Sequence, residues 1–324
     1  MLAAYAARRS FDDPLSALEV GDIDPPAVPD GWVTVELRSA SLNHHDIWSL
    51  RGVGLPEDRL PMILGCDAAG VTESGEEVVL HTIVADAARG GGNETNDPER
   101  TLLSELHPGT FAERVAVPAR NLIPKPAFLN WAQAGCLSTA WLTAYRMLFT
   151  RGQATAGQTV LVQGAGGGVA TAATAMAKAA GLRVWVTSRS EAKRSRALDV
   201  GADQAFEPGA RLPERVDLVV ETVGEATFNH SMKAVRPGGK VIVSGSTSGA
   251  NPPIELQRLF FLQLDLLGST MGSKDEFEAM LAFLAEHDLR PLVDSTYPLA
   301  EAREAFLRLE RGDVFGKIVL TWNS

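Results

Sequence analysis

The sequence predicts an α/β protein in which a doubly wound parallel sheet follows a β-rich part of the chain. Two observations support this fold class. Between residues 160 and 268, six short apolar runs rich in Val, Ile and Leu alternate with helical patterns. Such runs are typical of parallel strands that helices cover on both faces. Before about residue 123, strand patterns are separated by Pro and Gly turns instead.

The elements are expected in the following order along the chain. Strands at 32–37, 77–80 and 110–117 belong to the β-rich part, and the polar, glycine-bearing segment 88–108 is expected to be a surface loop. A helical region is expected at 131–150. The parallel strands are expected at 160–163, 183–187, 203–206, 216–220, 240–244 and 265–268. A helix with one apolar face at 298–312, ending at Gly312, precedes a last strand at 316–320.

The first of the parallel strands leads into a glycine cluster, which an alanine-rich helix follows. The pattern G/A-x-G-x-x-G/A falls on Ala165, Gly167 and Ala170. Small residues at these positions allow the tight turn, the approach of a pyrophosphate to backbone amides, and close packing of the helix. We therefore predict a dinucleotide site formed by Ala165, Gly166, Gly167, Gly168 and Val169. A tight turn in some other α/β protein is the alternative interpretation.

The end of the second strand indicates which dinucleotide is bound. An acidic residue about 20 positions after the glycines would bind the ribose 2′-hydroxyl of NAD. The chain instead has Ser188, Arg189 and Ser190 there, with Lys193 one helical turn later. Hydroxyls and a guanidinium favour a 2′-phosphate. We therefore predict NADP, whereas a solvated helix start is the alternative, and Glu191 is the nearest acid that could bind a ribose.

Ligands bind at the carboxyl ends of parallel strands, where this chain has small or hydroxylated residues. The cofactor-binding candidates at this edge are Thr222, Val223, Gly245, Ser246, Ser269, Thr270 and Met271. Ordinary turns are the alternative interpretation of these segments.

Composition excludes several classes of function. The formal charge of −10 and the lack of a basic run argue against a nucleic-acid partner. No apolar stretch reaches the ~20 residues of a membrane span. Arg8 and Arg9 follow the apolar start of the chain, which is the wrong order for a secretion signal. Cys66 and Cys136 offer no disulfide framework, so we expect a reducing compartment, the cytoplasm.

Six landmarks in the expected order make the chain resemble the medium-chain dehydrogenase/reductase superfamily. They are Asn43-x-x-Asp46, residues 65–70 (GCDAAG), 109–113 (GTFAE) and 142–145 (LTAY), the glycine fingerprint, and residues 316–320 (GKIVL). The resemblance implies a GroES-like catalytic barrel made of residues 1–122 and 290–324, with an inserted Rossmann domain at 123–289. It also implies that the coenzyme lies between the domains, and that the protein is a homodimer with strand 265–268 at its edge.

The resemblance also bears on zinc. Zinc-dependent alcohol dehydrogenases of this superfamily have Cys where this chain has Asn43, a His-Glu pair where it has Cys66-Asp67, and a further ligand at the position of Thr139. Asn and Thr are poor zinc ligands. The loop at 88–108 contains none of the four cysteines that hold the structural zinc of such enzymes. We therefore expect no metal.

Without zinc, the resemblance is to the quinone oxidoreductase branch, whose members transfer hydride from NADPH to quinones or enones. We expect a zinc-independent NADPH-dependent reductase of a quinone or an α,β-unsaturated carbonyl compound, of EC class 1.6.5 or 1.3.1. Because hydride addition builds negative charge on the substrate oxygen, hydrogen-bond donors should face that oxygen. Asn43, Asp46 and Thr139 are the catalytic candidates, with Asp46 in an orienting role. Water, His44 and His45 all remain open as the proton source.

Three further residues are predicted to contact the cofactor. The resemblance places Lys317 close to it, whereas a solvated cation is the alternative. Phe206 falls where relatives have an aromatic residue beside the adenine, although simple strand packing is equally compatible. Thr143 lies on the helix that precedes the Rossmann unit.

Three alternative functions remain open at this stage. A zinc alcohol dehydrogenase with unusual ligands would be recognised by metal analysis. A non-catalytic NADPH-binding protein would bind NADPH but turn over no quinone or enone. A methyltransferase, which has a similar glycine turn, would bind S-adenosylmethionine and no NADPH.

Overall fold

The computed structural model describes residues 1–322, which divide into two compact units. The first unit comprises Met1–Ala140, Ser273–Ala285 and a stretch that begins at Arg290. The second unit comprises Trp141–Gly272 and Glu286–Leu289. Residues 123–140 therefore belong to the first unit, whereas the family resemblance predicts the Rossmann domain for them. They are held there by hydrogen bonds, because Ser39 Oγ donates to Trp131 O and Ser138 Oγ donates to Leu80 O.

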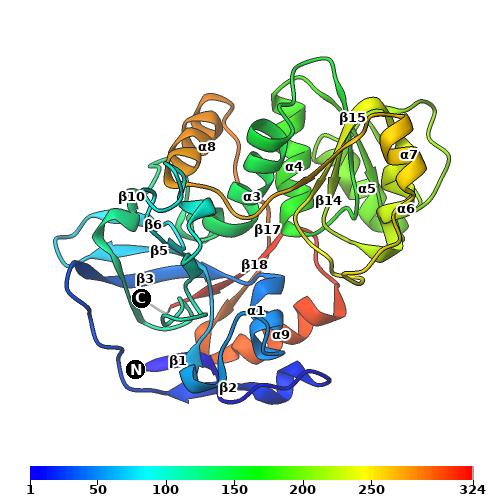
Figure 1. Ribbon diagram of the computed structural model, residues 1–324. Coiled ribbons are helices and arrows are strands. Elements are labelled where there is room, and N and C mark those ends of the chain that lie inside the picture. Colours follow the sequence, from blue (N-terminus) through cyan, green and yellow to red (C-terminus); the bar gives the residue numbers. More distant parts are fainter. Residues whose placement is uncertain (323–324) are drawn as a thin grey trace. The chain divides into compact units, whose positions relative to one another are not determined.

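The second unit contains a six-stranded parallel sheet in the order β13-β12-β11-β14-β15-β16. The strands are β11 (Thr159–Val162), β12 (Arg183–Thr187), β13 (Gln204–Phe206), β14 (Val216–Glu221), β15 (Val235–Val243) and β16 (Asp265–Gly268). The α-helices are α3 (Leu142–Tyr145), α4 (Gly168–Ala179), α5 (Glu191–Asp199), α6 (Glu225–Ala234) and α7 (Leu256–Phe261). Figure 1 shows α4 on one face of this sheet and α6 on the other, as in a doubly wound fold.

Apolar strand residues explain why this sheet is buried on both faces. Leu161, Val219 and Val241 are fully buried, and they pack with Trp185 and Phe228 in one core cluster. The strands therefore show near-continuous apolar runs instead of an alternating pattern. The predicted parallel strands are all present, with β15 starting five residues earlier than expected.

Within the described residues, the first unit contains three antiparallel or mixed sheets. The strands are β1 (Leu2–Ala6), β2 (Leu18–Asp22), β3 (Trp32–Ser41), β4 (Met62–Ile63), β5 (Asp67–Thr72), β6 (Glu77–Leu80), β7 (Ile83–Val84), β8 (Thr101–Leu102), β9 (Arg114–Pro118), β10 (Leu122–Pro124), β17 (Val293–Pro298) and β18 (Lys317–Thr321). The α-helices are α1 (His44–Leu50), α2 (Trp131–Ala134), α8 (Lys274–Glu286) and α9 (Ala302–Arg311). Short 3₁₀ helices lie at Pro14–Ala17, Glu57–Arg59, Glu94–Asn96, Ala119–Asn121 and Leu299–Glu301.

One part of the largest sheet brings distant parts of the chain together. β3 is flanked by β5 and by the final strand β18, both antiparallel to it. Ser41 therefore pairs with Asp67 on one side and with Val319 on the other. This register places the residues that follow β3, open β5 and open β18 at the same end of the sheet.

Two segments differ from the elements expected from the sequence. The loop at 88–108 includes the short strand β8 and surrounds Asp97, which is fully buried and paired with Arg89 at 2.8 Å. The helical region at 131–150 is divided into α2, α3 and two π-helical stretches, Leu137–Trp141 and Arg146–Arg151. Wide turns of this kind are frequent at functional sites.

Candidate functional site

The glycine turn between β11 and α4 is shaped by backbone conformations that favour glycine. Gly164 has a φ of +81° and Gly166 a φ of +109°, both in the left-handed region. A Cβ atom on Gly164 would lie 2.9 Å from Val223 Cγ2, so the turn also approaches the loop after β14 too closely for a side chain. Ala165 is buried, and its N–H donates to Thr187 O at 2.7 Å.

The start of helix α4 offers open space and uncapped amides. Gly167 is the N-cap, and no side chain makes a capping hydrogen bond there. A Cβ atom on Gly167 would meet nothing within 4 Å. The first amides of a helix have no partners within the helix, and its dipole favours an anion at this end. Gly166, Gly167, Gly168 and Val169 therefore provide a cradle that fits a pyrophosphate.

The loops after the neighbouring strands pack against this turn. A Cβ atom on Gly245 would lie 2.8 Å from Thr222 O, so the loops after β14 and β15 touch each other through backbone. Ser246 lies beside Gly224 in the same contact. The structure thus places Thr222, Val223, Gly245 and Ser246 together at the carboxyl edge of the sheet.

The end of β12 carries the residues predicted to bind a 2′-phosphate. Ser188 is buried, and its Oγ accepts the N–H of Ser190 at 3.2 Å. Arg189 is exposed at the start of α5, whose third residue is the half-buried Lys193. Arg194, which the sequence analysis did not single out, donates from Nη1 to Ser188 O at 2.7 Å. Three basic side chains therefore belong to this segment.

Phe206 lies on β13, where its ring makes an edge contact with Trp185 at a centroid distance of 5.6 Å. Thr143 Oγ1 lies 4.0 Å from the sulfur of Met271, which has the unusual φ of +48° for a residue other than glycine. In the same segment, Ser269 Oγ is buried and has no hydrogen-bond partner within residues 1–322, while Thr270 is exposed.

A buried ionic cluster lies in the first unit, where β3, β5 and β18 meet. The ammonium of Lys317 lies 2.6 Å from Asn43 Oδ1, 2.8 Å from Leu42 O and 3.2 Å from Asp67 Oδ2. Lys317 is 3% exposed and Asp67 is 0% exposed. Asp67 Oδ2 also accepts the hydroxyl of Ser41 at 2.8 Å. The three hydrogens of the ammonium thus have three acceptors, all within this unit.

This cluster fixes the orientation of the Asn43 side chain. Its carbonyl oxygen accepts from Lys317, and its amide nitrogen donates to Asp67 Oδ2 at 2.9 Å and to Ser41 O at 3.3 Å. The opposite orientation would point two donors at each other and two acceptors at each other. Both amide hydrogens of Asn43 are therefore used inside the protein.

Thr139 differs from Asn43 in this respect. Its Oγ1 is buried and has no hydrogen-bond partner in the described part of the chain. A buried hydroxyl normally has a partner, so Thr139 remains a candidate hydrogen-bond donor to a ligand.

Asp46 orients the start of helix α1. It is fully buried, and its two oxygens accept the N–H of Asn43 at 2.7 Å and that of Gly65 at 3.2 Å. Burial raises the pKa of its carboxyl to about 7, although the two backbone N–H groups and Lys317 act in the opposite direction.

The raised pKa of Asp46 predicts how stability depends on pH. Between about pH 4 and pH 7, the folded protein keeps a proton on Asp46 that the unfolded chain has released. The free energy of unfolding should therefore fall as pH rises through this range, by a few kcal/mol from this group. Urea unfolding at pH 4, 5, 6, 7 and 8 should show a flatter curve for Asp46→Asn than for the wild type. Identical pH slopes in the two proteins would contradict the prediction.

Two histidines follow Asn43 on α1. Burial lowers the pKa of both His44 and His45, and the charge of Lys317 adds to the effect at His44. His45 Nε2 lies 3.9 Å from a Glu105 carboxylate oxygen and 3.5 Å from Ser49 Oγ. Neutral imidazoles are therefore expected at physiological pH.

The residues at the zinc positions of related enzymes do not fit a zinc ion. Asp67 already accepts from an ammonium ion, and Asn43 is held by the same cation. Cys66 donates from Sγ to Leu103 O at 3.2 Å, and burial raises the pKa of its thiol well above the usual value. A second cation beside Lys317 would be repelled. Among residues 1–322, no three His, Cys, Asp or Glu side chains form a group that could hold a metal.

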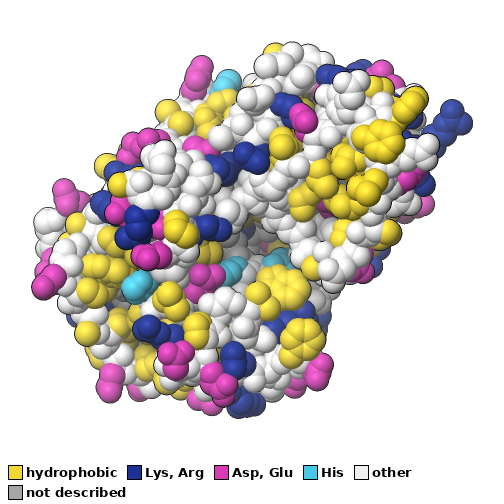
Figure 2. Space-filling model, viewed as in Figure 1, with side chains coloured by type: hydrophobic (Ala, Val, Ile, Leu, Met, Phe, Trp, Pro, Cys, Tyr) yellow, Lys and Arg dark blue, Asp and Glu magenta, His cyan; other side chains and the backbone are white. Residues whose placement is uncertain are grey.

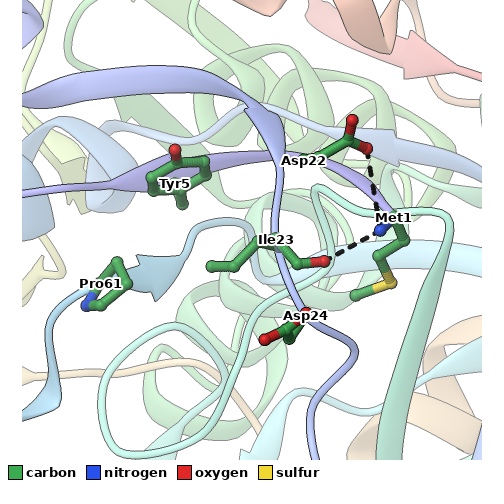
Figure 3. A pocket seen from close by; sticks show the side chains of 6 residues that line it. All are labelled: Met1, Tyr5, Asp22, Ile23, Asp24 and Pro61. Atoms are coloured by element: carbon green, nitrogen blue, oxygen red, sulfur yellow. Dashed lines mark hydrogen bonds and ion pairs between the residues drawn. The ribbon is translucent and has the colours of Figure 1, made fainter.

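A surface pocket of about 410 Å³ lies elsewhere in the first unit (Figure 3). The amino group of Met1 there donates to Ile23 O at 2.9 Å. The pocket contains none of the predicted site residues; it is lined by Met1, Tyr5, Asp22, Ile23, Asp24 and Pro61.

We also find no helix within the described chain that has the length and apolarity to cross a membrane.

Sequence reasoning missed several polar residues that shape the site. Ser41 and Arg194 were assigned no role, although Arg194 directly follows the predicted Lys193. Gln163, Thr187, Glu221 and Ser231 form a buried network in the second unit. Gln163, Thr187 and Glu221 share one signal in the sequence, a polar residue at the end of an apolar strand. Ser231 has no such signal, because it lies on helix α6.

Comparison with known proteins agrees with this architecture. Residues 29–127 match the family described as alcohol dehydrogenase GroES-like domain, and residues 168–286 match the family described as zinc-binding dehydrogenase. A solved structure described as an NAD-dependent alcohol dehydrogenase has 34% sequence identity and a TM-score of 0.90, with 100% of both chains covered.

Two curated relatives are reductases by name. A crotonyl-CoA carboxylase/reductase of Cereibacter sphaeroides is 28% identical over 95% of this chain and 84% of its own. A quinone oxidoreductase of Pongo abelii is 27% identical over 92% of each chain. Because the two family matches follow each other in the expected order and a relative of 34% identity spans the whole chain, the protein belongs to the medium-chain dehydrogenase/reductase superfamily of oxidoreductases.

Proposed function

We propose that this protein is a zinc-independent, NADPH-dependent reductase of a quinone or an α,β-unsaturated carbonyl compound. The observation that carries the proposal is the Lys317 ammonium, which binds Asn43 and Asp67 where zinc enzymes of the superfamily have metal ligands. The names of the two curated relatives support the substrate class, since one reduces quinones and the other a crotonyl thioester, an unsaturated carbonyl compound.

The proposed cofactor is NADPH, which would supply a hydride when bound. The cradle at residues 166–169 would hold the pyrophosphate, and Phe206, Thr143 and the loops after β14 and β15 would line the rest of its site. Ser188, Arg189, Lys193 and Arg194 would bind the 2′-phosphate. The solved relative named for NAD makes NADH the competing coenzyme.

We propose different roles for the three catalytic candidates. Thr139 Oγ1 has no partner in the described chain and would donate to the oxygen on which charge develops. Asn43 and Asp46 would orient the surrounding backbone, because their polar atoms are bonded within the protein. Lys317, which we predicted to contact the cofactor, would then act through Asn43. Water would provide the proton, since the lowered pKa values of His44 and His45 leave both imidazoles in the neutral form, without an acidic proton to donate at physiological pH.

The role of Thr139 can be tested with an isosteric variant. Thr139→Val should lower kcat for an enone or quinone about 100- to 1,000-fold. Thr82→Val is the matched control, because Thr82 Oγ1 is also buried without a partner within the described residues. That control should keep its activity. Equal activity of both variants and the wild type would exclude Thr139 as the donor.

The activity itself is tested by NADPH oxidation against a panel of quinones, enones and aldehydes, with and without a chelator. We expect turnover of a quinone or an enone that the chelator does not change. Chelator-sensitive aldehyde reduction would instead indicate a zinc alcohol dehydrogenase. NADPH binding without any turnover would favour a non-catalytic protein.

Coenzyme preference is tested at Arg189. Arg189→Ala should raise the Kd for NADPH about tenfold and leave that for NADH unchanged, because only NADPH loses a charged hydrogen bond. Arg196→Ala on helix α5, which begins two residues after Arg189, is the control and should preserve the preference. An unchanged NADPH preference in Arg189→Ala would show that the 2′-phosphate lies elsewhere.

We further propose a homodimer formed along β16. This strand is at the edge of its sheet and pairs only with β15 among the described strands. Beside it, α7 exposes Leu256, Phe260 (69% exposed) and Phe261 (76%), and Figure 2 shows hydrophobic side chains gathered over α7. An open edge beside an apolar patch fits a second copy of the chain. Light scattering should give twice the chain mass of 34.6 kDa. Cys66 and Cys136 are both buried and are not joined in a disulfide. We propose on this basis that the protein works in a reducing compartment, the cytoplasm.

A further inference from the structure

A chain of buried hydrogen bonds runs beneath the carboxyl edge of the six-stranded sheet. The N–H of Gly164 donates to Thr187 Oγ1 at 3.3 Å, and the Thr187 hydroxyl donates to Gln163 Oε1 at 2.6 Å. Gln163 Nε2 donates to Ser231 Oγ at 3.0 Å. The Ser231 hydroxyl donates to Glu221 Oε2 at 2.6 Å. Every donor points the same way, from the glycine turn toward one carboxylate.

Glu221 is the acceptor at the end of this chain, and it is 0% exposed. Its Oε1 accepts the N–H of Val223 at 2.8 Å and that of Gly224 at 3.1 Å. The hydroxyl of Thr227 lies 2.9 Å from both carboxylate oxygens. Burying an ionised carboxylate is costly unless such donors surround it, so this side chain determines the path of the loop after β14.

The contacts of His230 agree with the donor and acceptor roles assigned to these hydrogen bonds. Its Nε2 lies 3.0 Å from Ala210 O and therefore carries the proton, which leaves Nδ1 as an acceptor. That Nδ1 lies 3.0 Å from Gln163 Nε2, a donor. The amide of Gln163 thus has one orientation that satisfies Thr187, Ser231 and His230 together.

We propose that Glu221 is a positioning residue for the coenzyme, which it serves by fixing two loops at once. It holds the loop after β14 directly, through Val223 and Gly224, and it holds the glycine turn through Ser231, Gln163 and Thr187. Both loops belong to the proposed NADPH site, so this inference rests on the proposed function. Fully satisfied buried networks of this kind restrict a protein to one conformation. Glu221 itself would touch neither coenzyme nor substrate.

The test compares Glu221→Gln with a matched control on the same strand. Glu221→Gln keeps the size of the side chain but loses the charge and one acceptor. Asp217 lies near the start of β14, where it accepts the N–H of Thr159 at 2.7 Å and pairs with Arg236 at 2.7 Å. Asp217→Asn therefore disturbs the same strand at its other end. We expect Glu221→Gln to raise the Kd and KM for NADPH about tenfold with kcat within about twofold, and Asp217→Asn to leave all three within about twofold.

Hydrogen exchange of the coenzyme-free protein provides a second measurement. In Glu221→Gln, peptides containing Val223 and Gly224 should exchange faster, and so should the peptide containing Gly164. Ser231→Ala should accelerate the Gly164 peptide as well, because it interrupts the chain between the two loops. This second variant also carries the test if Glu221→Gln does not fold.

The outcomes separate the two proposals. If the wild type binds no NADPH, the proposed function is wrong and this inference fails with it. If the wild type binds NADPH and both folded variants bind it equally tightly, only the inference is overturned. The same holds if the Gly164 peptide exchanges at the wild-type rate in both variants.

Discussion

Lys317→Met should lower the free energy of unfolding by about 3–5 kcal/mol, because it leaves the carboxylate of Asp67 buried without its cation. Lys317 also binds Leu42 O and Asn43 Oδ1, so the substitution removes one of the groups that orient Asn43. Urea unfolding followed by tryptophan fluorescence measures the loss. A decrease of less than about 1 kcal/mol would mean that the ion pair does not carry the stability of this region.

A double substitution separates lost charge pairing from lost packing. Adding Asp67→Asn to Lys317→Met removes the unpaired charge, so the double variant should recover part of the stability that Lys317→Met loses. Arg38→Met is the control for an exposed pair, since Arg38 Nη1 lies 2.6 Å from Oε1 of the exposed Glu36. This variant should lower the free energy of unfolding by less than about 1 kcal/mol. No recovery in the double variant would indicate that packing of the lysine side chain dominates.

Gly167→Asp should raise the Kd for NADPH more than about 100-fold, equivalent to about 2.7 kcal/mol, and leave the protein folded. An added side chain at this N-cap meets open space, and aspartate is a favourable N-cap residue. Its carboxylate would bond the amides that we assign to the pyrophosphate and would repel that anion. Fluorescence titration with NADPH and thermal unfolding measure the two effects.

Gly167→Asn is the matched control for Gly167→Asp. It has the same shape and capping ability but no charge, so it should weaken NADPH binding much less. If Gly167→Asp binds NADPH like the wild type, the pyrophosphate does not lie at the start of α4. Equal losses in both variants would point to a steric effect instead of a charge effect.

The proposed mechanism differs from that of the zinc enzymes in what stabilises the charge on the substrate oxygen. A metal that polarises the substrate oxygen would be replaced here by neutral donors such as the Thr139 hydroxyl. The internal ammonium of Lys317 balances the charge of Asp67 but uses its three hydrogens within the protein. We therefore expect substrates whose acceptor carbon is already activated by conjugation, since these need less polarisation than an isolated carbonyl.

The sequence alone determined the parallel sheet and the glycine turn. Both depend on local patterns: short apolar runs between helices, and glycines where the backbone reaches a φ such as the +109° of Gly166. The end of the last helix was predictable for the same reason, because Gly312 adopts the left-handed conformation that ends it. The interior of segment 88–108 could not be predicted, because the exposed Arg89 pairs with the buried Asp97 and no periodicity in the sequence reveals this contact.

Only the tertiary structure decided how the polar residues are used. Asn43, Asp67 and Lys317 are up to 274 residues apart, and they meet because β18 pairs with β3. The sequence indicated Lys317 as a cofactor contact. It could not show that the ammonium of Lys317 already donates hydrogen bonds to the amide of Asn43 and the carboxylate of Asp67. The chain of buried hydrogen bonds from Gly164 to Glu221 could not be predicted from the sequence either, since it joins the ends of three strands and one helix. Local patterns fix backbone conformation, whereas the partners of a buried charge depend on which strands become neighbours.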